Sequence, residues 1–133
     1  MRALLVVALL VTATACQRDS EDETPAYLPA VVQDVAGGKQ VTFTAEGANR
    51  VGLRTALVRA RTVPYTALIY DAEGLAWVFV VDRPLRFLRT QVTVSRIEGQ
   101  VVRLTTGPAD GTAVVTVGAA EAYGAERDIA GGH

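Results

Sequence analysis

Few side chains in this chain of 133 residues have the types and spacing that enzyme chemistry requires. The only histidine, His133, is the last residue and follows two glycines, so it lacks the packed neighbours that orient a general base. Ser95 falls within a predicted strand, and no histidine stands near it as an activating base. A single histidine and a single cysteine cannot supply the usual ligands of a zinc site. We therefore expect no catalytic residue, no metal and no cofactor.

The carboxylates of the central part of the chain fall in predicted turns. A pair of them could meet as an acid and a base, but Asp residues and Glu-Gly combinations favour turns by themselves. The residues concerned are Asp71, Glu73, Asp82, Glu98 and Asp110. Trp77 and Tyr70 could line a ligand pocket, yet a Trp within an apolar strand is typical of a core. The pattern therefore predicts turns and a core in place of an active site.

The only cysteine, Cys16, directly follows a short hydrophobic segment. Arg2 precedes the apolar run at residues 3–11, which is too short to cross a bilayer core of about 30 Å and is typical of a signal peptide. The small residues before Cys16 resemble the lipobox of bacterial lipoproteins, although Ala13 stands where those proteins usually have Leu. The resemblance implies lipidation at Cys16, with two acyl chains for stable attachment. Alternatively, residues 13–15 form an ordinary A-x-A cleavage site, which leaves Cys16 as a free thiol.

The composition favours a single folded domain behind this segment. Half of the residues are hydrophobic, which is too many for a disordered chain. The formal net charge of -1 does not favour a nucleic-acid surface, which needs a basic stripe. We predict a signal peptide at residues 1–15, a lipid-anchored polar tether and lead-in at 16–39, a β-domain at 40–127 and a flexible tail at 128–133.

Local signals in the β-domain predict two short helices. Thr44 suits the N-cap of a helix over residues 45–51, because its hydroxyl can accept a hydrogen bond from an unpaired amide of the first turn. Gly52 fits the left-handed position that ends such a helix in a Schellman motif. A second, single helical turn is expected at residues 119–123, where Gly124 stops it.

The remaining apolar runs predict strands. Residues 40–44 alternate between apolar and polar, and Trp77–Val81 is a near-continuous apolar run that indicates a buried or central strand. A long strand-like segment at residues 85–97 turns back at Glu98-Gly99 into a further strand. The predicted fold is mainly β, a small β-barrel or β-roll of about seven strands with one or two short helices.

Two stretches of the chain resemble one known domain. Val41 to Val58 (VTFTAEGANRVGLRTALV) and the sequence from Val63 (VPYTALIYDAEGLAWVFVV) are similar to the membrane-proximal domain of periplasmic adaptor subunits, or membrane fusion proteins, of resistance-nodulation-division efflux pumps. The order and spacing of the matching positions carry the resemblance as far as Glu126. These positions include Ala67, Leu68, Asp71, Gly74, Trp77, Val92, Val94, Gly99, Gly107, Gly111, Val114, Val115, Gly118, Ala119, Glu121 and Tyr123.

The resemblance implies an adaptor reduced to this one domain. In the family the first stretch leads into barrel, lipoyl and α-hairpin domains, whereas here only residues 59–62 separate the two stretches. The family's domain docks on an inner-membrane transporter, and its hairpin is what reaches an outer-membrane channel. The resemblance thus implies a non-enzymatic lipoprotein, exported and membrane-anchored on the periplasmic or cell-surface side. Its expected partner is an efflux transporter or a full-length adaptor.

Other interpretations stay open at this point. The chain could be a stand-alone lipoprotein that binds a small ligand, an enzyme with titratable groups in a cleft, or a folded remnant without a partner. Arg83, Arg86 and Arg89 form a candidate docking surface around one turn and strand. A solvated charged edge that discourages sheet-to-sheet pairing is the simpler interpretation of these arginines.

Overall fold

A computed structural model describes residues 30–130, which form a mainly β structure with two helices. The mainly β prediction is therefore confirmed. In the described residues the strands are β1 (Ala30–Val35), β2 (Gly38–Phe43), β3 (Arg54–Leu57), β4 (Thr62–Pro64), β5 (Ile69–Tyr70), β6 (Ala76–Arg83), β7 (Arg86–Glu98), β8 (Val101–Thr106) and β9 (Ala113–Val117). The helices are α1 (Ala45–Val51) and α2 (Ala119–Ala130), with a short 3-10 turn, η1 (Tyr65–Ala67).

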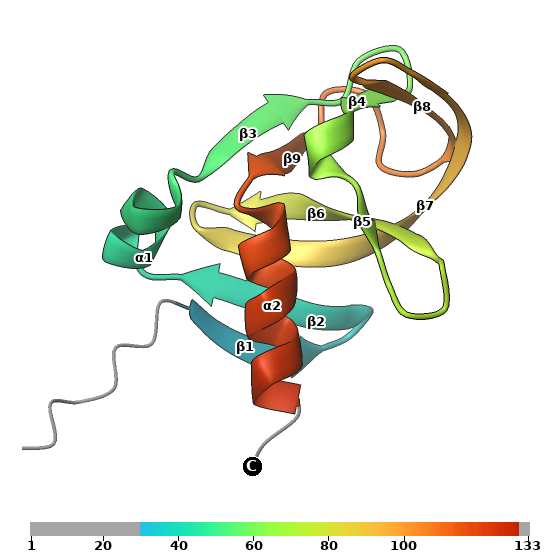
Figure 1. Cartoon of the computed structure of the whole chain (residues 1–133). Helices are drawn as coiled ribbons and strands as arrows, with labels where there is room; N and C mark the ends of the chain where they lie inside the picture. The colour runs from blue at the N-terminus through green and yellow to red at the C-terminus, as the bar shows by residue number, and fades with distance from the viewer. Residues whose placement is uncertain (1–29, 131–133) are drawn as a thin grey trace, which may run out of the picture.

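The strands form one antiparallel sheet that is not closed into a barrel, so the barrel form of the prediction is wrong. The main path runs β1-β2-β7-β6-β9-β3, and β7 also pairs with β8, which pairs with β4 (Figure 1). Register shifts between Thr93 and Arg96 redirect the second half of β7 toward β8. The sheet therefore folds over itself while its end strands, β1 and β3, stay apart in the strand order.

The strand count differs from the prediction for local reasons. Residues 30–39, expected to be a lead-in, form strand β1 and the start of β2, joined by a tight turn. Gly37 and Gly38 adopt φ values of 97° and 138° there, which the absence of a Cβ permits. The irregular apolar segment after α1 splits into two strands, β3 and β4, because a left-handed turn interrupts it at Ala60. The described residues therefore contain nine strands.

The central strands β6 and β9 are buried on both faces, which fits the continuous apolar run in β6. Neighbouring residues in a strand point to opposite faces, so Val78 and Phe79 enter different cores, as do Val114 and Val115. The first core lies under α1 and α2, and the second lies toward β4 and β8. Burying an apolar side chain of this size stabilises the fold by about 1.5–3 kcal/mol.

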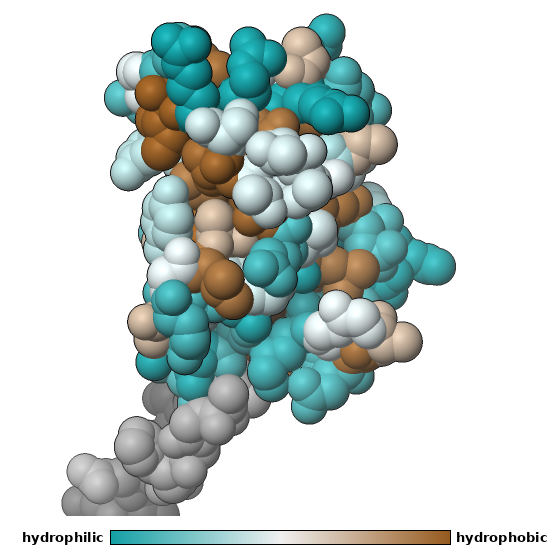
Figure 2. Space-filling model, turned by 90° about the vertical axis from the view of Figure 1, so that its right-hand side faces the viewer, coloured by the Kyte–Doolittle hydropathy of each residue, from teal (hydrophilic) through white to brown (hydrophobic). Residues whose placement is uncertain are grey.

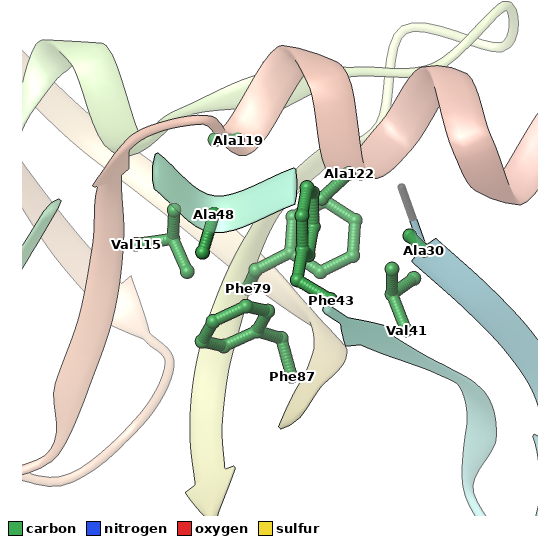
Figure 3. Packing of buried hydrophobic residues seen from close by; sticks show 9 residues of the cluster. All are labelled: Ala30, Val41, Phe43, Ala48, Phe79, Phe87, Val115, Ala119 and Ala122. Atoms are coloured by element: carbon green, nitrogen blue, oxygen red, sulfur yellow. The ribbon is translucent and has the colours of Figure 1, made fainter. Parts of the chain in front are cut away.

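Aromatic and small residues share the first core. Phe43, Phe79 and Phe87 gather beneath α2, and Ala119 and Ala122 bring the helix close to them (Figure 3). The Phe43 and Phe87 rings meet edge to face, with centroids 6.0 Å apart, a geometry that aromatic quadrupoles favour. The small side chains of α2 thus allow large rings to fill the space under the helix.

Helix α1 begins and ends as its sequence predicts. The Thr44 hydroxyl accepts a hydrogen bond of 2.9 Å from the Gly47 amide. Gly52 adopts a left-handed conformation with φ of 66°. Its amide donates to the Asn49 carbonyl, and the Leu53 amide donates to the Ala48 carbonyl. Both hydrogen bonds of a Schellman motif are therefore present.

Helix α2 is longer than its sequence predicts. It runs through Gly124 to Ala130, so the stop at Gly124 is wrong, and residues 128–130 are helical where we expected a flexible tail. An isolated glycine costs a helix only about 1 kcal/mol relative to alanine. Ala119, Ala122 and Glu126 recur on one face and are buried, and this packing outweighs the glycine.

Two glycines beside and within α2 should respond oppositely to alanine. A Cβ at Gly118, where φ is 98°, would lie 2.8 Å from the Leu53 Cδ1 atom. We expect Gly118→Ala to lower the free energy of unfolding by about 1–3 kcal/mol. A Cβ at Gly124 meets no atom within 4 Å, so Gly124→Ala should raise it by roughly 0.5–1 kcal/mol. Urea denaturation measures both values, and a Gly118→Ala variant as stable as the parent would contradict the packing described here.

Candidate functional site

A cluster of charged and aromatic side chains surrounds Arg89 on strand β7. Its guanidinium carbon lies 4.3 Å from the centre of the Trp77 ring and 5.7 Å from that of Tyr123. One guanidinium nitrogen lies 3.0 Å from the Glu126 Oε1 atom on α2. Cation–π contacts of this kind strengthen as the cation loses water. Arg89 therefore connects the sheet to the helix through an aromatic ring on each element.

This position contradicts the predicted arginine edge. Arg89 belongs to a strand with neighbours on both sides and points into the contact with α2. Arg86 pairs with Asp82, its Nε atom 2.7 Å from the Asp82 Oδ2 atom. The register places Arg83 opposite Arg86 at the turn between β6 and β7. The three arginines therefore do not form the shared docking surface that their spacing suggested.

Glu126 is a buried carboxylate with an incomplete set of partners. Its side chain is 4% exposed, and among the described residues its Oε2 atom has no hydrogen-bond partner. Burial raises the pKa of the Glu126 carboxyl, and the positive charges of Arg89 and Lys39 offset only part of this effect. A buried acid with a shifted pKa is a feature of many functional sites. In this structure the Glu126 carboxylate pairs with Arg89 and so holds α2 against the sheet.

Asp71 organises the turn between β5 and β6. Its Oδ2 atom accepts a hydrogen bond of 2.8 Å from the Trp77 indole nitrogen. Its Oδ1 atom accepts from the backbone amides of Leu75 and Glu73. Burial acts to raise the pKa of Asp71, but these hydrogen bonds lower it below its usual value. The predicted turn residue is therefore an acceptor that orients Trp77 toward Arg89.

Trp77 and Tyr70 differ from the expectation of a core or a pocket. Trp77 is half-buried, and its ring lies against Arg89 at the surface of the sheet. Tyr70 is exposed. Neither residue lines the surface hollows beside Asp110 described below.

Three of the other predicted turn carboxylates have a local structural role. Asp82 is the next-to-last residue of β6 and Glu98 is the last of β7, so both lie in strands instead of turns; Asp82 pairs with Arg86, and Glu98 with Arg96. Asp110 accepts hydrogen bonds of 3.0 and 2.9 Å from the Ala60 and Arg61 amides. The contacts of Asp82, Glu98 and Asp110 are those of structural acceptors, whereas Glu73 is exposed.

The hydrogen bonds that Asp110 accepts from two backbone amides hold an unusual turn between β3 and β4. Ala60 and Arg61 both have positive φ, 48° and 56°, which costs energy in residues with a Cβ. Arg59 and Thr62 close the turn by pairing with each other. Surface hollows of about 490 and 400 Å³ lie on the two sides of Asp110. The larger is lined by Arg61, Leu104, Thr105, Thr106, Gly107, Pro108, Ala109 and Asp110.

The predicted lipidation site, Cys16, lies outside the described part of the chain, as does His133, from which no catalytic or metal role was expected. Ser95 lies within β7, where its hydroxyl donates to the Arg103 carbonyl across the ladder.

The contact of Arg89 with Glu126 was missed because it joins residues far apart in the chain. One signal existed in the sequence, namely a carboxylate at position 126 on the same helix face as Ala119 and Ala122.

Three further findings bear on the kind of site this fold carries. Within residues 30–130, no helix is long and apolar enough to cross a membrane. Over the same range, no three His, Cys, Asp or Glu side chains gather as a metal site would need. The chain matches no model of a known protein family, and no curated protein matches it. An assignment of function therefore depends on the residues and geometry described above.

The raised pKa of Glu126 predicts a specific pH dependence of stability. A folded state that holds the proton more tightly than the unfolded state gains stability as pH falls. Relative to Glu126→Gln, the parent should therefore become more stable as pH falls from 7 toward the ordinary Glu value of 4.5. Urea denaturation at several pH values measures this difference. The exposed Glu121→Gln on the same helix is the control, and a parent that loses stability relative to Glu126→Gln would refute the assignment.

Proposed function

We propose that this protein is a non-enzymatic, membrane-anchored lipoprotein, an adaptor-like accessory module that contacts an inner-membrane efflux transporter or a full-length adaptor. The observation that carries the proposal is the junction between the two stretches that resemble the adaptor domain. Val41–Val58 and the stretch from Val63 fold into one sheet, and a tight turn at Ala60 and Arg61 joins them. In the resembling family, this is the place where the chain leads into its other domains.

The geometry of the junction supports this interpretation. The Thr62 amide donates to the Arg59 carbonyl over 2.9 Å, so the two chain ends flanking the turn lie side by side. Insertions and deletions of whole domains are tolerated best where chain ends are adjacent and at the surface. Val58 and Val63, on either side of the turn, are fully buried in the second core. The domain thus completes its core without any segment inserted at this turn.

Membrane anchoring in the proposal comes from Cys16. The acidic, polar residues 17–24 after it contain no apolar side chain and suit a tether between the anchor and the domain. Two acyl chains on Cys16 give stable attachment where a single chain is marginal. The anchor would place the domain beside membrane-embedded partners.

The non-enzymatic part of the proposal follows from the use of the carboxylates. Asp71 and Asp110 accept hydrogen bonds from turn amides, and Glu126 pairs with Arg89 inside the fold. A general acid or base needs access to a substrate proton. Residues committed to turns and to helix packing suit a scaffold for protein contacts better than a reaction centre.

One observation favours a second candidate, a stand-alone lipoprotein that binds a small ligand. The hollow of about 490 Å³ beside Asp110 has a volume typical of ligand sites. The guanidinium of Arg61 and the hydroxyl groups of Thr105 and Thr106 belong to residues along its wall. A ligand there would raise the melting temperature in proportion to its concentration above Kd.

Crosslinking in native membranes, followed by purification through a C-terminal tag, tests the adaptor-like function. We expect an efflux transporter or a full-length adaptor to copurify with the parent, and labelled palmitate to be incorporated at Cys16. Cys16→Ala should lose the label and the membrane attachment, and with them most of the copurified partner, because the anchor supplies the local concentration. A parent that carries the label but captures neither class of subunit would refute the accessory role and favour the ligand-binding candidate.

A further inference from the structure

The hairpin between β7 and β8 exposes apolar side chains at its end. Ile97 and Val101 flank the turn and are 45% and 48% exposed. Tyr65 is 45% exposed and lies beside them, because its amide donates to the Gln100 carbonyl over 2.8 Å. Exposed apolar residues that gather at one place mark an interaction site more often than scattered ones do. We call these three residues the apolar tip.

Two arginines stand directly behind the apolar tip. The register of β8 places Arg103 opposite Arg96 on β7 and opposite Thr62 on β4. Val101 occupies the next outward-facing position of β8, opposite Glu98 and Pro64. The arginines therefore share one face of the hairpin with Val101, whereas Ile97 is paired with the buried Val102 and emerges from the other face at the end of the hairpin.

The pairing of these arginines is unfavourable within the protein itself. Like charges at directly opposite positions of two strands destabilise a sheet. Glu98 neutralises Arg96 over 2.7 Å, but within residues 30–130 Arg103 forms no ion pair. Residues 59–65 and 96–103 together hold four arginines and this single carboxylate, and the Asp110 carboxylate also lies at this end, on the amides of Ala60 and Arg61. Glu98 thus compensates Arg96 alone, and the charge of Arg103 is left to interact with an anion outside the protein.

The surface at this end of the molecule is mixed in polarity. Figure 2 shows strongly hydrophilic and strongly hydrophobic residues side by side at the top of the molecule, the end where Figure 1 places β4 and β8. Side chains of this mixed kind suit the boundary between water and lipid, where tyrosine lies at the level of the headgroups and arginine meets the phosphates. We propose that the β7–β8 hairpin docks on the surface of an anionic phospholipid bilayer through the apolar tip, Arg96 and Arg103.

The length of chain before the domain permits this contact. By register, Ala30 on β1 lies level with Phe43 on β2, next to the start of β7, and the apolar tip lies at the other end of β7. That strand of 13 residues is at most about 43 Å long, at roughly 3.3 Å per residue. The 14 steps from Cys16 to Ala30 span up to about 50 Å. An anchor at Cys16, which rests on the proposed function, therefore leaves the hairpin free to reach the same membrane.

A second hairpin of the same domain provides a matched control. The turn between β5 and β6 exposes Tyr70 and Leu75 to 48% and 44%, much as the apolar tip is exposed. Its charged residues are Asp71 and Glu73, which an anionic surface repels. The two hairpins thus match in apolar exposure and differ in the sign of their charge.

The experiment uses the full chain with Cys16→Ala, so that one introduced cysteine carries an environment-sensitive fluorophore. The label is placed at Val101→Cys or, as the control, at Leu75→Cys, and vesicles of phosphatidylglycerol are compared with vesicles of phosphatidylcholine. We expect a blue shift and quenching by a lipid-borne quencher only for the label at 101 and only on anionic vesicles. The response should weaken as salt rises, because screening acts on exposed charges.

Two substitutions test the arginines separately from the fold. With Arg96→Gln and Arg103→Gln combined, the ratio of docked to undocked hairpin should fall about 30-fold, since each arginine near an anionic surface contributes about 1 kcal/mol. An unchanged melting temperature shows that the variant is folded, and the salt dependence of the parent tests the charges without any substitution.

The outcomes separate this inference from the proposed function. Equal responses at positions 101 and 75, no response at 101, or an equal response on neutral vesicles would each overturn the anionic membrane contact. A crosslinker placed at position 101 that captures protein instead of lipid in native membranes would also overturn it. The parent's palmitate label and copurified partner test the lipoprotein role, and both are read without vesicles. A failed docking experiment therefore leaves that role standing, and the reverse also holds.

Discussion

The structure depends on one long strand that both cores share. Strand β7 pairs with β2 and β6 along its first part and with β8 along its last. Phe87 enters the core beneath α2, and Val92 enters the core beside β4 and β8. Neither core is complete without it. The register shifts near Thr93 bend the strand and let it change partners, so that one strand serves both cores.

Arg89 adds a polar connection in the first half of the same strand. A buried ion pair contributes little net stability, because removing two charges from water offsets most of their attraction. The contact of Arg89 with Glu126 therefore sets the orientation of α2 more than it adds to the free energy of unfolding. It fixes α2 over the first core at one rotation, with Trp77 and Tyr123 packed around the guanidinium group. Asp71 in turn holds the Trp77 ring through its indole nitrogen.

Sequence patterns predicted the features that depend on neighbouring residues. Thr44 and Gly52 set the ends of α1 through hydrogen bonds to residues a few positions away. The apolar run in β6 indicated a buried or central strand, and this strand is buried on both faces. The extension of α2 past Gly124 and the pairing of Glu126 with Arg89 depend on packing between distant segments, which no local pattern encodes. The same reason explains why Arg89 was assigned to an edge. Its environment is set by the strand order, and the spacing of arginines along β7 does not show it.

Strand β7 joins the hairpin β1–β2 to the β7–β8 hairpin at its other end, and we expect the two parts to unfold together because both cores share this strand. Native-state hydrogen exchange tests this claim most directly, because it measures the free energy of opening for separate parts of one strand. We expect the amides of the β2–β7 ladder and of the β7–β8 ladder to exchange from their most protected positions with the same free energy. Both values should equal the free energy of global unfolding. A β7–β8 ladder that opens independently, at a clearly lower free energy than the β2–β7 ladder, would contradict the account.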